Sequence, residues 1–315
     1  MFDIVMPLFN KEIYVARTIE SVIGQTFGDW KLIIVDDGSS DGGPAVVEGF
    51  RDPRIEMIRQ ENAGPGAARN TGILAGKADW IAFLDADDLW LPEHLATMDE
   101  LRRQFPSASL IGTAYRHWNG KGVPRVRAGQ GSARTIRYFH EAAQGRAPFF
   151  TSSAAFSRQA IDRVGLLQPV VVGDEMDLWA RLALDGPVAA STRQTVLYRV
   201  GTGGITDSSD AVEAQNLAEI SLPTATLAER LDTISDPQLR SDVEEYVDFD
   251  VGLALMRAVR TGRIAYARRL LKLFLVGPRG KARTAAALAK LPAPWGQRLL
   301  HLAFGLKRAL RFTIA

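Results

Sequence analysis

The stretch Lys31-Leu-Ile-Ile-Val-Asp36 decides the fold class, because it is apolar on both faces of an extended strand and ends in an acidic residue. The stretch Trp80-Ile-Ala-Phe-Leu-Asp85 repeats this pattern. Strands that are apolar on both faces are typical of a parallel sheet that helices cover on both sides. Ligands bind beyond the carboxyl ends of such strands, so we expect both aspartates to point into one crevice.

The segments around these two strands alternate between short apolar runs and amphipathic stretches. They predict strand, helix, strand, helix, strand, helix and strand at Ile4–Met6, Ile13–Gln25, Leu32–Val35, Pro44–Phe50, Ile55–Ile58, Ala67–Gly76 and Trp80–Leu84. Beyond residue 106 the pattern is more mixed, with a Gly-rich turn region at Gly120–Gly131, helices near Arg158–Val164 and Glu175–Leu184, and a strand near Thr195–Val200. We therefore expect an α/β domain over residues 1–205 and an all-helical region over 206–315.

The composition limits the chemistry and the location open to the chain. Its 315 residues are 46% apolar and 23% charged and include no cysteine. This excludes disulfides and thiolate sites, so any metal must be held by oxygen or histidine. The four histidines match no ligand spacing. No segment reaches the ~18 apolar residues of a transmembrane helix, and the first seven residues do not resemble a signal peptide, so we expect a cytoplasmic protein.

Charge is distributed unevenly along the chain. All 36 acidic residues lie at or before Asp250, whereas residues 251–315 hold 14 Lys and Arg and no acid. A basic segment gains about 1 kcal/mol per basic residue near an anionic lipid surface. We expect residues 251–315 to bind an anionic membrane on its cytoplasmic face; packing on the first domain, or on a second copy in a homodimer, is the alternative. No nucleic-acid motif accompanies the charge, so nucleic acid is not an expected partner.

Two acidic turns follow the predicted central strands. Val35-Asp-Asp-Gly-Ser-Ser-Asp41 either forms a tight turn with a helix N-cap or offers carboxylates to a nucleobase N–H or a ribose hydroxyl. Asp85-Ala-Asp-Asp88 places three carboxylates within four residues, and they repel one another unless a cation holds them. Mg²⁺ or Mn²⁺ binds one or two carboxylates together with phosphate oxygens, so this turn predicts a metal–diphosphate site. A solvated loop before a helix at Leu91–Arg102 is the alternative.

A Gly-rich segment, Asn62-Ala-Gly-Pro-Gly-Ala-Ala-Arg-Asn70, lies between the two acidic turns. It enters a predicted helix and could present backbone N–H groups and Arg69 to an anion. A plain turn and helix start would also account for it, since it lacks the glycine patterns of dinucleotide and P-loop sites.

Taken in order, five segments resemble glycosyltransferase family 2, whose members are inverting, nucleotide-sugar-dependent enzymes with the Rossmann-like GT-A fold. The segments are Val5-Met-Pro-Leu-Phe-Asn-Lys-Glu12, Ser21-Val-Ile-Gly-Gln-Thr-Phe27, Val35-Asp-Asp-Gly-Ser-Ser-Asp41, Asn62-Ala-Gly-Pro-Gly-Ala-Ala-Arg-Asn70 and Phe83-Leu-Asp-Ala-Asp-Asp88. The resemblance is close to continuous over residues 3–105 and patchy to about 205. It implies a GT-A domain over 1–205, with nucleotide-sugar binding in 1–105 and the acceptor side in 106–205.

The resemblance also implies residue roles in donor binding. They fall on Pro7, Phe9, Asn10, Glu12, Asp36, Asp37, Arg69, Asp85 and Ala86. Of these, Pro7, Phe9 and Asp37 would contact the base, and Asp85 would face the ribose or the sugar. Asp87 would ligate the Mn²⁺ or Mg²⁺ that bridges the two phosphates, and Arg69 would meet the donor from the opposite wall.

A general base for the acceptor hydroxyl is implied within Gly173-Asp-Glu-Met-Asp-Leu-Trp-Ala-Arg181. Relatives carry a Glu-Asp pair before a Leu-Trp helix, whereas the order here is Asp174-Glu175, so the base falls on Glu175 first and on Asp174 second. Acids that merely favour a helix N-terminus are the alternative. Many relatives also carry a metal-binding histidine near Gly201, which this chain lacks, so its metal binding is expected to be weaker.

The implied function is sugar transfer from a nucleoside-diphosphate sugar, UDP or dTDP being favoured, to a glycan or lipid-linked acceptor in cell-surface polysaccharide synthesis. The competing interpretation is an inactive nucleotide-sugar or glycan-binding module of the same fold, which the reversed acidic pair and the missing histidine would explain.

Overall fold

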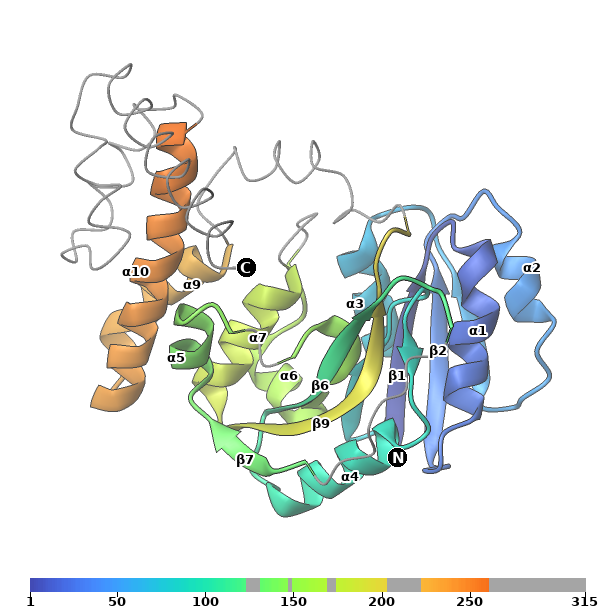
Figure 1. Ribbon diagram of the computed structural model, residues 1–315, viewed down its shortest axis with the longest axis horizontal. Coiled ribbons are helices and arrows are strands. Elements are labelled where there is room, and N and C mark those ends of the chain that lie inside the picture. Colours follow the sequence, from blue (N-terminus) through green and yellow to red (C-terminus); the bar gives the residue numbers. More distant parts are fainter. Residues whose placement is uncertain (123–130, 147–148, 169–173, 203–221, 261–315) are drawn as a thin grey trace, which may run out of the picture. The chain divides into compact units, whose positions relative to one another are not determined.

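The first 85 residues form the expected alternation of strands and helices (Figure 1). The strands are β1 (Phe2–Leu8), β2 (Trp30–Asp36), β3 (Ile55–Arg59) and β4 (Trp80–Phe83), and the connecting helices are α1 (Glu12–Ile23), α2 (Gly43–Glu48) and α3 (Pro65–Ala75). β1 lies parallel between β2 and β4, and β2 pairs in parallel with β3. The carboxyl ends of these strands therefore reach one edge of the sheet.

The second half of the sheet mixes strand directions. Its elements are β5 (Leu89–Trp90), α4 (His94–Gln104), β6 (Leu110–Trp118), β7 (Ala133–Ile136), α5 (Tyr138–Ala143), the 3-10 turn η1 (Thr151–Ser153), β8 (Ala154–Ser157), α6 (Arg158–Val164), α7 (Asp174–Asp185) and β9 (Val188–Arg199). The strand order is β3-β2-β1-β4-β8-β6-β9-β5, with β7 paired to β9. β8 is antiparallel to both β4 and β6, whereas β6 and β9 are parallel.

This computed structural model describes residues 1–122, 131–146, 149–168, 174–202 and 222–260. The chain divides into two compact units, Met1–Ser209 and Asp210–Ala315. In the second unit the described residues form α9 (Leu222–Arg230), the 3-10 turn η3 (Leu231–Thr233) and α10 (Pro237–Arg260). Most of the basic segment 251–315 lies outside the described residues. Among the helices that the structure describes, none has the length and low charge needed to cross a bilayer.

Apolar residues fill both faces of the sheet in the first unit. On one face, α1 presents Val15, Ile19 and Val22 at helical spacing to a cluster that includes Ile34 of β2 and Leu95 of α4. On the opposite face of β2, Ile33 and Val35 pack against Ala68 of α3. Trp179 of α7 contacts the rings of Phe83 in β4 and Phe156 in β8. Successive side chains of these buried strands thus point to opposite faces of the sheet and pack against a layer of helices on each face.

The sequence prediction misses most of the mixed half of the sheet. The predicted strand at Thr195–Val200 is the end of the longer β9, and β6, β7, β8 and α5 were not predicted. β6 begins with buried apolar residues but ends in a polar stretch with exposed Arg116 and His117, so its apolar run is too short to indicate a nine-residue strand. The predicted helix at Leu91–Arg102 begins only at His94.

Candidate donor and catalytic site

The end of β1 and the residues that follow it include four of the predicted donor residues: Pro7, Phe9, Asn10 and Glu12. Pro7 lies within β1, and Phe9 just after it is 46% exposed, as a base-stacking ring would need to be. Asn10 has a positive φ of 52°, the only such value for a non-glycine among the described residues. This left-handed turn, which asparagine tolerates better than most side chains, directs the chain into α1.

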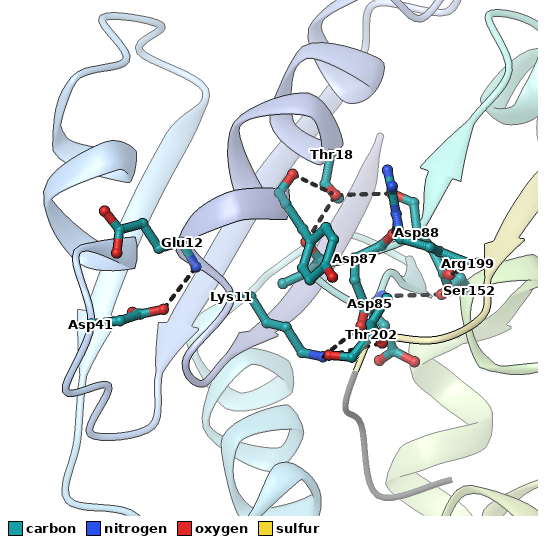
Figure 2. A network of polar contacts seen from close by, with 12 residues as sticks. Lys11, Glu12, Thr18, Asp41, Asp85, Asp87, Asp88, Ser152, Arg199 and Thr202 are labelled. Atoms are coloured by element: carbon teal, nitrogen blue, oxygen red, sulfur yellow. Dashed lines mark hydrogen bonds and ion pairs between the residues drawn. The ribbon is translucent and has the colours of Figure 1, made fainter. Parts of the chain in front are cut away.

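Asn10 and Glu12 connect this turn to the loop after β2. The Asn10 side-chain oxygen accepts a hydrogen bond from the Ser40 N–H at 2.8 Å. The Glu12 carboxylate accepts from the Gly42 N–H at 3.0 Å, and Asp41 accepts from the Glu12 N–H at 2.8 Å (Figure 2). Both predicted pocket residues therefore fix the loops around the pocket.

Asp36 and Asp37, at the end of β2, differ in how fully their oxygens are used. Asp37 accepts three hydrogen bonds, from Gln60 Nε2 at 2.7 Å, Ala63 N at 3.0 Å and Gly64 N at 2.9 Å. It thereby fixes the Gly-rich segment in front of α3. Asp36 accepts from the Ser39 N–H at 3.0 Å and lies 3.8 Å from Arg59 Nε. Asp36 thus retains more acceptor capacity than Asp37.

The turn after β4 gives each of its three aspartates a different partner. Asp85 Oδ1 accepts from Arg69 at 2.8 Å. Asp87 Oδ2 pairs with Lys11 Nζ at 2.7 Å (Figure 2). Asp88 is fully buried and accepts from Ser152 Oγ and from the backbone N–H of Arg199. The sequence predicted that these three carboxylates repel one another. In the structure, a cationic side chain compensates the charge of Asp85 and of Asp87, and neutral donors bind Asp88.

Burial governs the acidity of two of these carboxyl groups. Burial raises the pKa of Asp88 well above its ordinary value, and the neighbouring charges of Asp85 and Asp87 raise it further. Burial also raises the pKa of Asp85, against the opposing effect of the Arg69 charge. Asp88 has both oxygens engaged by protein donors, so it is a structural member of the turn.

The hydroxyl of Thr18 supports the same turn from α1. Its Oγ1 lies 2.9 Å from both the Ala86 and the Asp88 carbonyl oxygens (Figure 2). Ala86, which we predicted to line the donor site, thus contributes its carbonyl to the support of the turn. These contacts hold the backbone of Asp85–Asp88 against the N-terminal half of α1.

Arg69 links the donor-side acids to the predicted base. Its guanidinium is buried and lies 2.8 Å from Asp85 and 3.6 Å from Asp174. Burial by itself lowers the pKa of Arg69, but the charges of Asp85, Glu175 and Asp174 outweigh it and raise the pKa above its ordinary value. A Cβ at Gly66 would lie 2.6 Å from Asp174 Oδ2, so a larger residue there would displace this carboxyl group.

The acidic pair begins α7, as predicted. Burial raises the pKa of Asp174 to about 8, and the adjacent Glu175 adds to the effect. Burial would also raise the pKa of Glu175, but the Arg69 charge and hydrogen bonds outweigh burial and lower it to about 2. Glu175 is partly exposed and accepts from Thr151 Oγ1 at 3.1 Å, whereas Asp174 is buried. Near neutral pH these opposite shifts favour a proton on Asp174 and an accessible carboxylate on Glu175.

Several members of this site were not predicted from the sequence. Lys11 lies inside a quoted motif, but no spacing rule indicates that it reaches Asp87, 76 positions away. Ser152 receives the Asp85 N–H at 3.0 Å and donates to Asp88, and its neighbour Thr151 binds Glu175. Both hydroxyls lie in η1, in a part of the chain without a recognisable motif.

Comparison with known proteins shows the family of this chain. A family model described as glycosyl transferase family 2 matches residues 3–165. The chain belongs to this family. The succinoglycan biosynthesis protein ExoO of Rhizobium meliloti is 33% identical over 171 residues, which are 53% of this chain and 46% of ExoO. The Escherichia coli UDP-Glc:alpha-D-GlcNAc-diphosphoundecaprenol beta-1,3-glucosyltransferase WfgD is 40% identical over 96 residues, which are 30% of this chain and 38% of WfgD.

This family 2 chain thus aligns with less than half the length of either relative. Two solved structures share its fold over most of its length. Staphylococcus aureus TarS 1–349 in complex with UDP-GlcNAc has a TM-score of 0.59 at 14% identity, covering 91% of this chain and 90% of that one. The Pyrobaculum calidifontis mannosyltransferase PcManGT, in complex with GDP-Man and Mn²⁺, has a TM-score of 0.60 at 19% identity, covering 98% and 80%. The expected α/β fold of GT-A type is confirmed.

Gly201, where many relatives of the family carry a metal-binding histidine, has a backbone reason to be glycine. Its φ is 78°, in the left-handed region that side chains with a Cβ rarely adopt. A histidine at this position would be strained unless the backbone changed.

Proposed function

We propose that this protein is an inverting glycosyltransferase that transfers a sugar from a nucleoside-diphosphate sugar to a hydroxyl of a glycan or lipid-linked acceptor in cell-surface polysaccharide synthesis. UDP and dTDP are the favoured donors; the TarS complex with UDP-GlcNAc and the UDP-Glc in the name of WfgD support uridine. The name of WfgD also supports a lipid-linked acceptor, and that of ExoO supports polysaccharide synthesis.

One observation carries this proposal: the donor-side acids and the acidic pair of α7 belong to one polar network. Arg69 contacts Asp85 and Asp174, and the adjacent hydroxyls of Thr151 and Ser152 bind Glu175 and Asp88. A base and a leaving-group site must lie close together for an in-line displacement. A purely structural role for either acidic cluster would not require this connection.

The residues of the Asp85 turn suit a divalent cation. Asp87 Oδ2 already binds a cationic group, the Lys11 ammonium, and one carboxylate with diphosphate oxygens and water is a common Mg²⁺ or Mn²⁺ ligand set. PcManGT was solved with GDP-Man and Mn²⁺. We propose that Asp87 holds Mn²⁺ or Mg²⁺, which would neutralise charge on the departing diphosphate.

The other steps fall to the side chains of this chain. Glu175 accepts the proton of the acceptor hydroxyl, whose oxygen forms a bond to the anomeric carbon as the bond from that carbon to the diphosphate oxygen breaks. This single displacement inverts the anomeric configuration. Asp174 and Arg69 position Glu175, and Asp36 and Phe9 bind the base. Asp37, which the resemblance placed at the base, instead shapes the pocket through the Gly-rich segment, because its oxygens already accept three hydrogen bonds from the protein.

The test is release of nucleoside diphosphate from a panel of nucleotide-sugars with Mn²⁺ or Mg²⁺. We expect one donor to turn over, with loss of about 10²–10⁴-fold in Glu175→Gln because general base catalysis contributes this much. Glu56→Gln, which alters only the exposed pair with Lys31, should retain wild-type turnover. Donor binding without turnover in the presence of lipid-linked and free glycan acceptors would favour the inactive module instead.

The basic segment supports a further part of the proposal, attachment to an anionic membrane. Its 14 Lys and Arg without any acid are the basis for it. We expect the protein to sediment with phosphatidylglycerol vesicles and to be released by salt. Equal sedimentation with zwitterionic vesicles would contradict an electrostatic attachment.

A further inference from the structure

Lys11 places a second positive charge at the proposed metal ligand. Its ammonium lies 2.7 Å from Asp87 Oδ2 and 3.4 Å from both the carbonyl and the hydroxyl oxygen of Thr202. Figure 2 shows Lys11 reaching across from the end of β1 to the turn after β4. The Lys11 and Asp87 side chains are only 17% and 14% exposed, so bulk water screens this pair incompletely.

Local structure by itself does not favour a lysine at this place. Lys11 is the N-cap of α1, where the helix dipole disfavours a cation and where its side chain caps no N–H group. Its side chain instead extends away to the acidic turn. Asp87, the two Thr202 oxygens and the Tyr14 ring give this lysine a favourable environment, and Asp87 is the only charged group among them.

A lysine ammonium and a divalent ion disfavour each other at one carboxylate oxygen, even though that oxygen has lone pairs for two partners. A Mg²⁺ or Mn²⁺ ion binds oxygen at about 2.0–2.2 Å, and an ammonium 2.7 Å from that oxygen would lie within a few ångström of the ion. Two positive charges at this separation repel strongly in a partly desolvated site.

We propose that the Lys11 ammonium competes with the divalent metal for Asp87 and so lowers the metal affinity of the donor-free protein. The proposal rests on the assignment of Asp87 as metal ligand. Its consequence is that metal binds Asp87 well only when diphosphate oxygens add to the ligand set, so metal and donor enter together.

The experiment measures Mn²⁺ binding directly, from the electron paramagnetic resonance signal of free Mn²⁺, with no nucleotide present. We expect Lys11→Met to bind Mn²⁺ about tenfold more tightly than the wild type, since a partly buried ion pair no longer has to be broken. Lys11→Arg keeps a cation and should bind as weakly as the wild type. Lys31→Met removes an exposed lysine paired with Glu56 and should change nothing.

Asp87→Asn separates this inference from the assignment beneath it. If Asp87→Asn binds Mn²⁺ as the wild type does, Asp87 is not the metal ligand and the metal part of the proposed function is wrong. If Asp87→Asn weakens binding while Lys11→Met equals the wild type, only the competition is wrong. If the wild type shows no measurable binding, binding gained in Lys11→Met supports the competition and its absence there overturns it. Thermal unfolding of each variant checks that it is folded.

Discussion

The two acidic turns that follow β2 and β4 look alike in the sequence and are stabilised in different ways. Asp37 of the first turn binds two backbone N–H groups and one amide. Asp85 and Asp87 of the second turn bind the side chains of Arg69 and Lys11. Backbone donors cannot leave without rebuilding the loop, whereas a cationic side chain can exchange for a ligand. The difference supports our proposal that Asp37 of the first turn is scaffold and that the second turn takes part in the reaction.

Among variants that test the difference between the two turns, we expect the largest effect on turnover from Asp87→Ala. Turnover should fall on the order of 10²–10³-fold, because charge on the departing diphosphate loses its compensation. The free energy of unfolding should change by about 1 kcal/mol or less, since only one ion pair is lost. Steady-state kinetics and thermal unfolding measure the two quantities. A large loss of stability with intact turnover would reverse the roles of the turns.

In the first turn the balance should be opposite. Asp37→Ala removes three hydrogen bonds to a buried carboxylate, so we expect a loss of about 3 kcal/mol in the free energy of unfolding. Chemical denaturation followed by circular dichroism measures this loss. Asp29→Ala, which removes an exposed partner of the N-terminus, serves as control and should cost less than about 0.5 kcal/mol. Equal stability of the two variants would contradict the scaffold role.

A hydroxyl deletion compares the supports of the two turns. Ser152→Ala removes the acceptor of the Asp85 N–H and a donor to buried Asp88, with an expected cost of about 2 kcal/mol. Ser40→Ala in the first turn removes an exposed hydroxyl that contacts Asn10, and thermal unfolding should detect almost no change. If the two deletions cost the same, the second turn does not depend on η1.

The smallest expected effect is on the pH dependence of the free energy of unfolding. It arises from Asp174, which Arg69 connects to the second turn. Because the pKa of Asp174 is raised from 3.8 to about 8, the folded protein binds the extra proton between these values, and its stability falls as pH rises through this range. Asp174→Asn lacks this loss, so its free energy of unfolding should rise relative to that of the wild type by about 1 kcal/mol between pH 7 and pH 8. Exposed Asp162→Asn should show a constant difference over this range in thermal unfolding. A constant difference for Asp174→Asn as well would mean that Asp174 is ionised throughout.

The parallel half of the fold could be predicted from the sequence, and the mixed half could not. Strands such as Leu32–Val35 are apolar on both faces, a pattern that depends on no distant partner. β6 and β9, in contrast, acquire their lengths from pairing with each other across about 80 residues. Sequence periodicity reports burial of local segments and does not report such pairing.

The candidate site shows the same limit at the level of side chains. The acids at strand ends, Arg69 and Glu175 stand in motifs, and the fold brings them into one network. Their hydrogen-bond and ion-pair partners Lys11, Thr151 and Ser152 come from other segments of the chain. These partners do not lie at a fixed sequence distance from the acids that they bind. A motif identifies which carboxylates cluster, but the tertiary fold determines which of them receive a backbone N–H, a hydroxyl or a cation.

The neighbouring hydroxyls of Thr151 and Ser152 have a geometric consequence for the proposed reaction. One binds the base and the other the donor turn, and their Cα atoms are separated by a single peptide unit of about 3.8 Å. The spacing between nucleophile activation and leaving-group departure is thus built into one rigid backbone step. Acceptors of different shape could be selected by the surrounding surface while this interval stays constant.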